Sequence, residues 1–497
     1  MLFLALDQST SATKALLFDR AGDVVDRESR EHRQLYPRPG WVEHDAAEIW
    51  ANTRATLQEL LRRHAARREE IAGLSLTNQR ETVVVFDRAS GEPLAPAIVW
   101  QCRRGEELCA AHRAAGAEPL VRARTGLSLD PYFSASKLQW LVRNRPDLRT
   151  RLADGSALVG TIDAYLVHRL TRGEVFATDA TNASRTLLFD IARLRWDDEL
   201  CGLFEVPVRA LPEVRACSAA FGATTLDGLL PRALPICGVM GDSQASLFAQ
   251  RCFTPGSAKV TFGTGSSLLL NLGPRPRLTG NGVLTALAWT HAGAPTYAFE
   301  GIVISSASTL TWLRDQLGLA EDVPALERLA AGVEDSGGVH LVPAFTGLGL
   351  PHWRPNARAA ITGLSPHSDR RHVARAAFES IAFQVADALD ALRAEAGTPV
   401  GSIHADGGPT ASAFLMQLAA DLTQAELRVA RHPEASPLGA MLAGQLGQGF
   451  IRSIAEIAAL PQDEIVYRPA LPAARAAARR AAWDAAVRQV LAGSPGS

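Results

Sequence analysis

The chain begins with a strand-like segment that runs into a turn of small polar residues and out into a second strand-like segment. The stretch reads LFLAL, then DQSTSAT, then KALLFD, and a third such segment, VVDRESR, follows the turn RAGD. Short runs bounded by turn residues predict three β-strands joined by tight turns. This start constrains the fold strongly, because it commits residues 2–30 to strands.

The segment HDAAEIWANTRATLQELLRRH has the pattern of an amphipathic helix. Asp45, followed three residues later by Glu48, forms a capping-box pattern at its start. The positions expected to face a core recur at helical spacing and are Ile49, Trp50, Thr53, Leu57, Leu60 and Leu61. A predicted strand, IAGLSLT, then ends at the polar run Asn78, Gln79, Arg80 and Glu81. Strands and helices that alternate in this way favour an α/β fold.

Length and charge limit the class of protein further. The chain of 497 residues is too long to fold around one ordinary hydrophobic core, so its length predicts two or three domains. The formal net charge of -1 gives no general attraction to nucleic acid or to an anionic membrane. No basic leader and no run of eighteen apolar residues occurs, so we expect a cytoplasmic protein without membrane insertion. The cysteines are scattered along the chain, a spacing that favours free thiols in a reducing compartment over disulfides or a zinc site.

The second half of the chain opens in a similar way. The predicted strand AKVTF leads into the turn GTGSS and out through LLLNL. A strand, a small-residue turn and a strand therefore occur twice, which suggests a duplicated architecture, although any hairpin can use small residues.

Three turns of Gly, Ser and Thr have the composition of phosphate-binding loops. They are DQSTSATK, which ends in Lys14, FGTGSS at 262–267 and DGGPTAS at 406–412. Consecutive backbone N–H groups in such turns can converge on phosphate oxygens. Each turn alone is equally a structural hairpin or helix start, but three in one α/β chain favour a nucleotide.

Two common nucleotide loops are excluded by inspection. None of the lysines, Lys14, Lys137 and Lys259, follows a glycine, so the Walker A pattern is absent. GTGSSL lacks the third glycine of the dinucleotide fingerprint and leads into a strand. The actin-like architecture remains, in which two related domains each present a hairpin to the phosphates.

The stretch GDSQ, residues 241–244, places a carboxylate and a hydroxyl between an apolar segment and a predicted helix at 243–251. Asp242 could cap this helix, take part in chemistry, or do both. GDSQA also resembles a serine-hydrolase nucleophile elbow, but Ser243 would need a histidine base and none is marked out. A serine hydrolase and a catalytically silent actin-like binding protein are therefore kept as alternatives.

The chain resembles the FGGY-type carbohydrate kinases, and among them the glycerol kinases, over nearly its whole length. Ordered segments carry the resemblance, among them LALDQSTSATKALLFD, PGWVEHDAAEIW, LTNQRETVVVFD, AIVWQCRR, TGLSLDPYFSASKLQWL, TDATNASRTLLFD, VPAFTGLGLPHW, ITGLSPHSDRRHVARAAFESIAFQ and DGGPTASAFLMQ. The resemblance implies an α/β fold of two ribonuclease-H-like domains of the actin and hexokinase type, residues 1–245 and 246–497, flanking a cleft. It implies transfer of the γ-phosphate of ATP, with Mg²⁺, to a hydroxyl of glycerol or a related small polyol or sugar, by a homodimer or homotetramer.

The resemblance also assigns roles to individual residues. Asp242 matches the general base, and Asp7 and Asp242 match the carboxylates near Mg²⁺. The residues that match polyol contacts are Arg80, Glu81, Trp100 and Tyr132, together with Asp242, Ser243 and Ser267. Those that match nucleotide contacts are Thr10, Ser11 and Lys14 in the first turn, Gly263, Thr264 and Gly265 in the second, and Thr311, Gly407, Gly408 and Ser412 elsewhere.

Some of these positions depart from the glycerol kinase pattern. Ser243 stands where glycerol kinases have glutamine, and Ser267 stands where they have phenylalanine. Both changes shrink a side chain at the substrate, which predicts a larger and more polar pocket. The alternative substrate is therefore a four- or five-carbon polyol or ketose, such as a tetritol, xylitol or xylulose. Ser412 replaces an asparagine near the adenine, a change expected to affect only nucleotide contacts.

Overall fold

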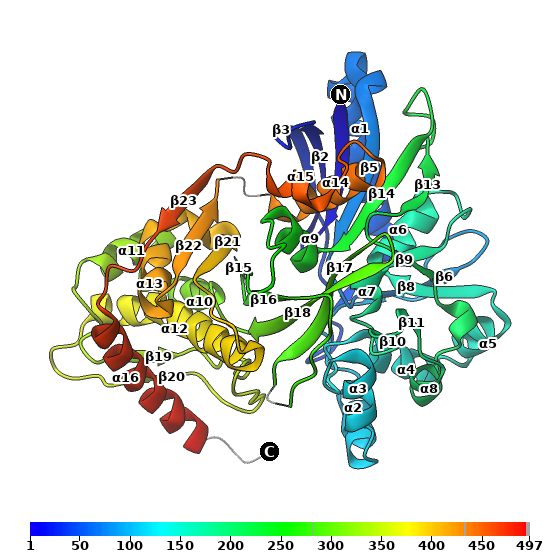
Figure 1. The fold of residues 1–497 in the computed structure, drawn as a ribbon. Coiled ribbons are helices and arrows are strands. Elements are labelled where there is room, and N and C mark those ends of the chain that lie inside the picture. The colour runs from blue at the N-terminus through cyan, green and yellow to red at the C-terminus, as the bar shows by residue number, and fades with distance from the viewer. Residues whose placement is uncertain (281, 432–433, 494–497) are drawn as a thin grey trace.

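Two large β-sheets organise the protein, as Figure 1 shows for the computed structural model, which describes residues 1–280, 282–431 and 434–493. The first sheet has the order β13-β14-β5-β1-β2-β3. Its strands are β1 (Leu2–Gln8), β2 (Ala12–Asp19), β3 (Val24–Glu31), β5 (Ile71–Asn78), β13 (Ala220–Thr224) and β14 (Leu234–Gly241). The strands β1, β2 and β3 are antiparallel neighbours, which confirms the three strands predicted at the start of the chain.

The second sheet repeats the plan of the first. Its order in the described residues is β17-β18-β16-β15-β21-β22-β23. The strands are β15 (Ala258–Phe262), β16 (Ser266–Gly273), β17 (Leu284–His291), β18 (Ala294–Val303), β21 (Ser402–Asp406), β22 (Glu426–Ala430) and β23 (Glu464–Tyr467). The series β18-β16-β15-β21-β22 has the same strand directions as β3-β2-β1-β5-β14. The suggested duplication is therefore confirmed.

Helices cover both faces of the first sheet. The apolar side chains of β1 alternate between them: Leu4 and Leu6 join a cluster with α1 (Ala46–Arg63) and α6 (Ile162–Leu170), whereas Phe3 and Ala5 face α9 (Asp242–Ala249) and α14 (Ala435–Gly447). A strand buried on both faces reads as a continuous apolar run, as LFLAL does. Because α14 comes from the second half of the chain and packs on β5 and β14, the two halves of the sequence interleave (Figure 1).

Asp45 forms the predicted cap of α1, but only half of the capping box is present. Its carboxylate accepts the N–H groups of Ala47 and Glu48. The Glu48 carboxylate accepts instead from the Arg33 side chain, at 3.0 Å. Five of the six predicted core positions of α1 are buried. The sixth, Trp50, is half-exposed and lies under the guanidinium of Arg169.

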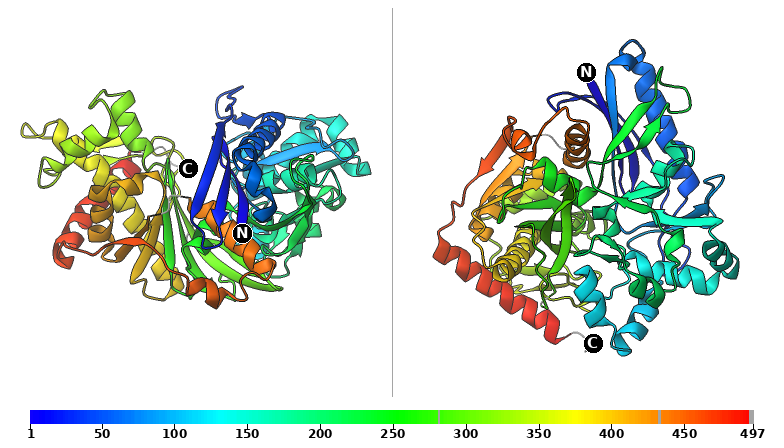
Figure 2. Two further views of the ribbon diagram at one scale, coloured as in Figure 1. Left: turned by 90° about the horizontal axis from the view of Figure 1, so that it is seen from above. Right: turned by 45° about the vertical axis from the view of Figure 1, so that its right-hand side comes forward.

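The second sheet is covered by α12 (Arg370–Ala396) and α13 (Ala413–Thr423), with α10 (Ser308–Asp315), α11 (Val323–Ala331) and α16 (Ala473–Ala492) around them. The helix α16 lies along the outside of this part of the molecule (Figure 2). Trp483 of α16 stacks on Phe383 of α12 with ring centroids 5.2 Å apart, and its Nε1 donates to Asp387 Oδ2 at 2.7 Å. The helix α16 is thus docked by an aromatic pair and a partly buried hydrogen bond.

The helix α9 lies where the two sheets meet. One apolar cluster joins Met240, Leu247 and Phe248 of the α9 region to Leu269 and Trp289 of the second sheet. The start of α9 therefore sits at the junction between the two repeated units, which is where GDSQ falls in the sequence.

Residues of the first half of the chain also form a third, smaller sheet. It has the order β4-β7-β6-β8, from β4 (Glu43–His44), β6 (Val83–Asp87), β7 (Ala97–Ile98) and β8 (Ala157–Thr161), beside α2 (Glu106–Ala114), α3 (Glu118–Thr125), α4 (Ser134–Asn144) and α5 (Pro146–Asp154). The remaining strands and α-helices are β9 (Ala177–Asp179), β10 (Phe189–Asp190), β11 (Arg195–Trp196), β12 (Glu213–Arg215), β19 (His340–Val342), β20 (Ala360–Thr362), α7 (Ala180–Ala183), α8 (Asp198–Leu203) and α15 (Ile454–Ala458). In the described part of the chain, no helix is long and apolar enough to cross a membrane.

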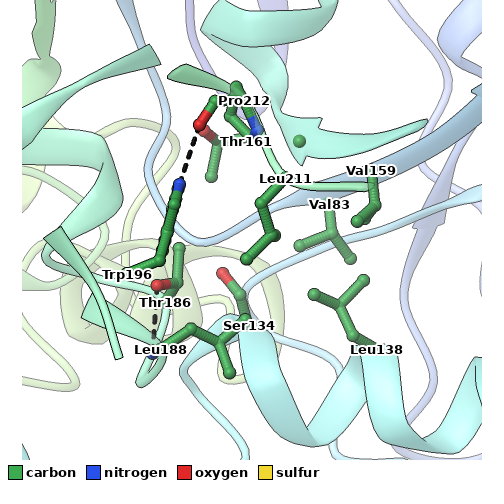
Figure 3. A pocket seen from close by; sticks show the side chains of 11 residues that line it. Val83, Ser134, Leu138, Val159, Thr161, Thr186, Leu188, Trp196, Leu211 and Pro212 are labelled. Carbon is green, nitrogen blue, oxygen red and sulfur yellow. Dashed lines mark hydrogen bonds between the residues drawn. The ribbon is translucent and has the colours of Figure 1, made fainter. Parts of the chain in front are cut away.

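A small internal cavity lies between α4 and this third sheet (Figure 3). Its volume is about 10 Å³, and its lining includes Val83, Leu138 and Leu188. A space of this size holds one water molecule at most. The cavity is therefore a packing defect of the core, and the candidate site lies elsewhere.

Candidate active site

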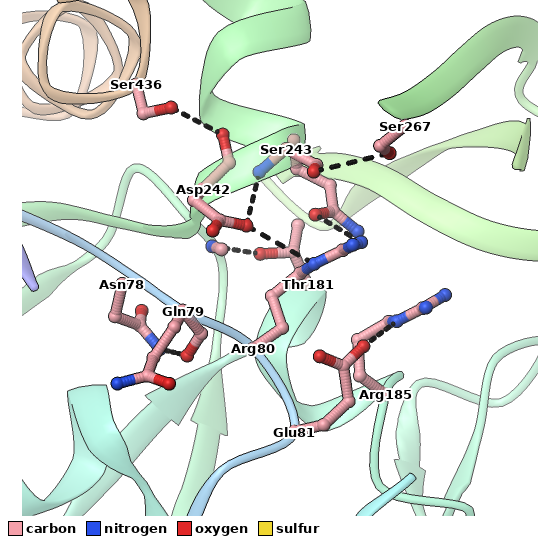
Figure 4. A network of polar contacts seen from close by, with 12 residues as sticks. Asn78, Gln79, Arg80, Glu81, Thr181, Arg185, Asp242, Ser243, Ser267 and Ser436 are labelled. Carbon is pink, nitrogen blue, oxygen red and sulfur yellow. Dashed lines mark hydrogen bonds and ion pairs between the residues drawn. The ribbon is translucent and has the colours of Figure 1, made fainter. Parts of the chain in front are cut away.

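Two parallel strands bring GDSQ beside the polar run that follows β5. Gly241 of β14 is in register with Asn78 of β5, so the residues that follow each strand emerge side by side at one edge of the sheet. Arg80 Nε lies 3.3 Å from Asp242 Oδ1 (Figure 4). A Cβ on Gly241 would lie 2.8 Å from Arg80 Cγ, so a larger residue at 241 would displace Arg80.

Asp242 is the first residue of α9, and Gly241 occupies the N-cap position. Of the roles that the sequence left open for Asp242, N-capping is therefore excluded, because the chain turns into the helix one residue earlier. The carboxylate still accepts the N–H of Ser243, at 2.7 Å, and lies at the positive end of the helix dipole. Ser436 Oγ of α14 donates to the Asp242 carbonyl at 2.9 Å, and the Asp242 side chain remains 38% exposed. Asp242 is thus fixed from its backbone while its carboxylate stays accessible.

Arg80 and Glu81 belong to a buried ion network. Arg80 Nη2 lies 2.9 Å from Glu300 Oε1, and Arg185 Nε donates to Glu81 Oε1 at 2.6 Å. Glu300 also contacts Arg185 Nη1 through its other carboxylate oxygen. Burial raises the pKa of Glu81, whereas the charges of Arg185 and Arg80 outweigh burial and hold the pKa of Glu300 below its ordinary value. The network places two carboxylates and two guanidinium groups beside Asp242.

Glu81 adopts a left-handed backbone conformation, with φ of 63°. Such a conformation is uncommon for a residue with a side chain and costs on the order of 1 kcal/mol or more. Ser134 Oγ donates to the Glu81 carbonyl at 2.8 Å, and Arg185 binds its carboxylate, so both ends of the residue are fixed. The strained turn directs Glu81 into the buried network.

Arg185 and Glu300 were not among the residues predicted for the site. Arg185 lies in the segment TDATNASRTLLFD, which carries part of the family resemblance. Glu300 is a lone charge in the apolar strand YAFEGIV. A charge in a buried strand requires a partner, and that requirement was the available signal in the sequence.

Trp100 and Tyr132 lie together, with ring centroids 5.3 Å apart. Tyr132 precedes α4, and the buried Lys137 of α4 holds its loop by donating to the carbonyls of Tyr132, at 2.8 Å, and Phe133, at 3.1 Å. Trp100 Nε1 donates to Thr10 Oγ1 at 3.0 Å. The predicted polyol wall is therefore bonded directly to the first predicted phosphate turn.

The first turn joins β1 to β2. Ser9 closes it, because Ser9 Oγ donates to the Ala12 carbonyl at 3.0 Å, and Ser11 is exposed at its tip. Asp7 and Lys14 are directly opposite each other in the hairpin, and Lys14 Nζ lies 3.0 Å from Glu434 Oε2. The turn therefore presents an exposed hydroxyl beside a lysine that is held by Glu434, the residue that precedes α14.

Asp7 is a buried carboxylate beside two others. Burial first, and then the charges of Asp242 and Glu434, raise the pKa of Asp7 to about 7, although Lys14 acts in the opposite direction. Within the described residues, no group of three or more His, Cys, Asp or Glu side chains forms a ready-made metal site. The pair Asp7 and Asp242 is accordingly the candidate for a cation that also uses ligands from a bound phosphate.

The second turn, Gly263–Gly265, joins β15 to β16. A Cβ on Gly265 would lie 2.6 Å from the Val303 carbonyl, so only glycine fits there. Ser306 N donates to the Thr264 carbonyl at 2.8 Å, which attaches the turn to the segment before α10. Thr264 and Thr311 both line a pocket of about 320 Å³ with Ser308, Trp312, Asp315 and Gln316. Two predicted nucleotide residues, far apart in the sequence, thus share one pocket.

The third turn packs against the second. Gly407 has a φ of 97°, and a Cβ there would lie 1.8 Å from the carbonyl of Phe262, the last residue of β15. Gly408 faces open space, with no neighbouring atom within 4 Å of a Cβ position. Ser412 is the N-cap of α13, where its Oγ accepts the N–H of Leu415 at 3.0 Å. Gly407 therefore lets the chain pass closely over the carbonyl of Phe262, where the second turn begins.

Ser243 and Ser267 connect the two repeated units. Ser243 follows Asp242 in α9, and Ser267 lies in β16 two residues after the second turn. Their Oγ atoms are 3.5 Å apart (Figure 4). The site thus has two small hydroxyl side chains beside Asp242, and the contact of Ser243 Oγ in the described structure is with another serine and not with a histidine.

The fold and these clustered residues have the arrangement expected of a two-domain phosphotransferase, and comparison of the sequence identifies the family. Residues 2–249 match the N-terminal domain of the FGGY family of carbohydrate kinases, and residues 258–447 match the C-terminal domain. The chain belongs to this family. The predicted fold class and the predicted ATP-dependent carbohydrate kinase activity are confirmed.

Named relatives match the chain over almost their whole length. A glycerol kinase of Leptothrix cholodnii is 47% identical over 493 residues, covering 98% of this chain and 99% of the relative. A glycerol kinase of Shewanella amazonensis is 43% identical over 488 residues, covering 98% of each. The crystal structure of Plasmodium falciparum glycerol kinase with ADP superposes with a TM-score of 0.92 at 33% identity, covering 99% of this chain and 98% of that one.

Proposed function

We propose that the protein transfers the γ-phosphate of ATP to a hydroxyl of glycerol, with Mg²⁺, between a first domain of residues 1–245 and a second of residues 246–497. The observation that carries the proposal is the position of the Asp242 carboxylate. It lies 3.3 Å from Arg80 Nε, and its charge adds to burial in raising the pKa of Asp7. The glycerol kinases that match the chain over nearly its full length support glycerol as the acceptor.

In this mechanism Asp242 is the general base. An alcohol is a poor nucleophile at neutral pH, so a carboxylate within hydrogen-bond reach accepts its proton as the phosphoryl group is transferred. Arg80 donates to hydroxyl oxygens and Glu81 accepts from hydroxyl protons, a pairing that suits a polyol. Trp100 and Tyr132 contact the carbon chain. The base, the polar contacts and the apolar wall together orient one hydroxyl of the polyol for attack on the γ-phosphate.

Asp7 and Asp242 are the proposed holders of Mg²⁺. The ion is usually held by one or two carboxylates together with substrate phosphates, and the raised pKa of Asp7 in its buried carboxylate group is consistent with a place for a cation. When bound, Mg²⁺ neutralises charge on the transferring phosphoryl group. Thr10, Ser11, Lys14, Gly263, Thr264 and Gly265 are proposed to hold the phosphates, and Thr311, Gly407, Gly408 and Ser412 the adenosine.

A four- or five-carbon polyol or ketose is the second candidate acceptor. The observation that favours it is the pair of hydroxyls of Ser243 and Ser267, 3.5 Å apart beside Asp242. Small polar side chains leave room and hydrogen bonds for additional hydroxyl-bearing carbons.

A panel of acceptors tests both candidates. ADP release is measured with glycerol, tetritols, pentitols and ketoses, and the phosphorylated product is identified for each. The proposal predicts the highest kcat/KM with glycerol, whereas a preference of about tenfold or more for a longer acceptor would establish the second candidate. ADP release that no acceptor stimulates would contradict both.

We also propose a homodimer or homotetramer in the cytoplasm. The family resemblance supports the assembly, and six free, buried cysteines suit a reducing compartment. Light scattering of the purified protein measures the assembly directly, and a monomeric mass would contradict it.

A further inference from the structure

Glu300 is a fully buried carboxylate in the middle of β18, a strand of the second sheet. Neighbouring strands enclose it on both sides, with Leu269 of β16 and Leu284 of β17 directly opposite in the register. Burying an ionised carboxylate costs several kcal/mol unless it is paired. A charged side chain at this position is therefore strongly destabilising unless oppositely charged partners reach it.

Both partners of Glu300 come from the other repeated unit. Arg80 follows β5 of the first sheet, and Arg185 follows α7. Glu300 Oε1 lies 2.9 Å from Arg80 Nη2, and Glu300 Oε2 contacts Arg185 Nη1. Arg80 is 5% exposed and Arg185 is fully buried. Glu300 is thus the carboxylate that the second sheet contributes to two buried guanidinium groups of the first repeated unit.

The charges alternate in sign through the site. Going from Asp242, the order is Arg80, Glu300, Arg185 and Glu81, each in contact with the next. Asp242, the proposed base, and Glu81, the carboxylate proposed to bind the polyol, are therefore the two ends of one chain of ion pairs. Glu300 is its central member and lies in β18 of the second sheet, whereas the other four belong to the first repeated unit, in α9 or in the segments that follow β5 and α7.

Removing the charge of Glu300 would leave each of the two guanidinium groups with one carboxylate of this chain instead of two. Arg80 would then be drawn toward Asp242, and Arg185 toward Glu81, because each would have lost its shared partner. Both remaining carboxylates are proposed to act on the substrate. The geometry of the polyol site thus depends on a residue that does not reach the polyol.

We propose that Glu300 is a positioning residue for the polyol site, holding Arg80 and Arg185 in place from the second domain. The inference rests on the proposed function, because it assigns the effect to polyol binding through Arg80 and Glu81. The polyol site is accordingly complete only when the two sheets are docked at α9. Nucleotide binding, which uses other residues, is independent of Glu300.

The test is Glu300→Gln, which keeps the size of the side chain and removes its charge. We expect the KM for the polyol to rise by about tenfold or more and the KM for ATP to stay within about twofold, and direct polyol binding by titration calorimetry to weaken in parallel. The matched control is Glu379→Gln on α12, because Glu379 is also buried and contacts two arginines, Arg375 at 2.6 Å and Arg479. The control should lower thermal stability and leave polyol KM unchanged.

A double-mutant cycle distinguishes positioning from a general loss of structure. In an Arg80→Lys background, Glu300→Gln should raise polyol KM by much less than in the wild type, because the residue it acts through is already altered. Glu300→Asp, which keeps the charge, should restore part of the binding. If Glu300→Gln folds poorly, the KM values for polyol and ATP are compared in Glu300→Asp instead, where we expect the rise in polyol KM to be smaller.

Equal rises in the KM values for polyol and ATP, or additive effects with Arg80→Lys, would overturn the inference. So would wild-type polyol binding by Glu300→Gln. A wild-type protein that binds and phosphorylates no polyol would instead overturn the proposed function, and the inference with it. The wild-type assay therefore tells the two failures apart.

Discussion

The Nε atom of Arg80 lies 3.3 Å from Oδ1 of Asp242, and the two residues follow adjacent parallel strands of the first sheet. Asp242 begins a helix and Arg80 is buried, so the guanidinium fixes the orientation of a carboxylate that remains partly exposed. A base must be oriented before it can accept a proton efficiently. This contact therefore connects the strand order of the fold to the proposed chemistry.

The hydrogen bond from Trp100 to Thr10 couples the polyol wall to the first phosphate turn. Trp100→Phe keeps an aromatic wall but removes the Nε1–H that donates at 3.0 Å. One hydrogen bond of this kind is worth about 1 kcal/mol, so we expect the KM for ATP to rise about fivefold. In a cycle with Thr10→Val the second change should add little, and fully additive effects would show that the bond does not couple the two groups.

Ser243 and Ser267 control the length of the acceptor in our account. Ser243→Gln and Ser267→Phe together should lower kcat/KM for tetritols, pentitols and ketoses by about tenfold more than for glycerol, because the larger side chains fill the space beside Asp242. The measurement is the acceptor panel run on wild type and the double variant. Unchanged relative preferences would mean that these two positions do not set acceptor size.

Ser412 caps α13, since its Oγ accepts the N–H of Leu415 at 3.0 Å. Ser412→Ala should lower stability by about 1 kcal/mol, because the N–H of Leu415 loses its N-cap acceptor. Ser412→Asn should be close to neutral, since asparagine is an equally good N-cap residue, and this equivalence explains why serine can replace the asparagine of the family pattern. Thermal unfolding measures both, and a similar loss in the two variants would contradict the capping role.

Asp387 gives the docking of α16 a pH dependence. Burial raises the pKa of Asp387 to about 6, against the opposing effects of Trp483 and Arg480. A raised folded-state pKa means that the folded protein binds more protons than the unfolded chain between pH about 4 and 6, so stability falls as the pH rises through that window.

The loss is on the order of 3 kcal/mol at most, and Asp387→Asn should remove it while keeping an oxygen for the Trp483 N–H. Denaturant unfolding from pH 4 to 8 measures the difference between the two proteins. Asp390→Asn, on the same helix and also beside Arg480, is the control that should retain the wild-type trend. A difference between wild type and Asp387→Asn that does not change with pH would contradict this account.

Local patterns in the sequence predicted much of the fold. The apolar runs of β1 and β2, the helical spacing of α1 and the strand that leads to Arg80 all follow from residues close together in the chain. The duplicated sheet was suggested by two similar turns and became clear only from the strand order. Composition of a turn is a local property, whereas strand order depends on the whole chain.

The buried ion network could not be predicted in the same way. Glu300 meets Arg80 and Arg185 through tertiary contacts, and ion pairs between distant segments leave no periodic pattern in the sequence. The left-handed conformation of Glu81 is also invisible there, because a non-glycine residue at positive φ has no sequence signature. The helix start was misjudged by one residue for a related reason, since Gly241 and Asp242 are both acceptable N-cap residues.

The central claim is that Asp242 accepts the proton of the attacking hydroxyl, and Asp242→Asn tests it most directly. Asp198→Asn is the matched control, because Asp198 is likewise the first residue of its helix, α8, and is exposed. The measurement is kcat for phosphorylation of the preferred polyol, with ATP binding determined separately by calorimetry. We predict that Asp242→Asn lowers kcat by about 10² to 10⁴-fold with ATP affinity nearly unchanged, and that Asp198→Asn behaves as wild type. Retention of more than about a tenth of kcat by Asp242→Asn would contradict the account.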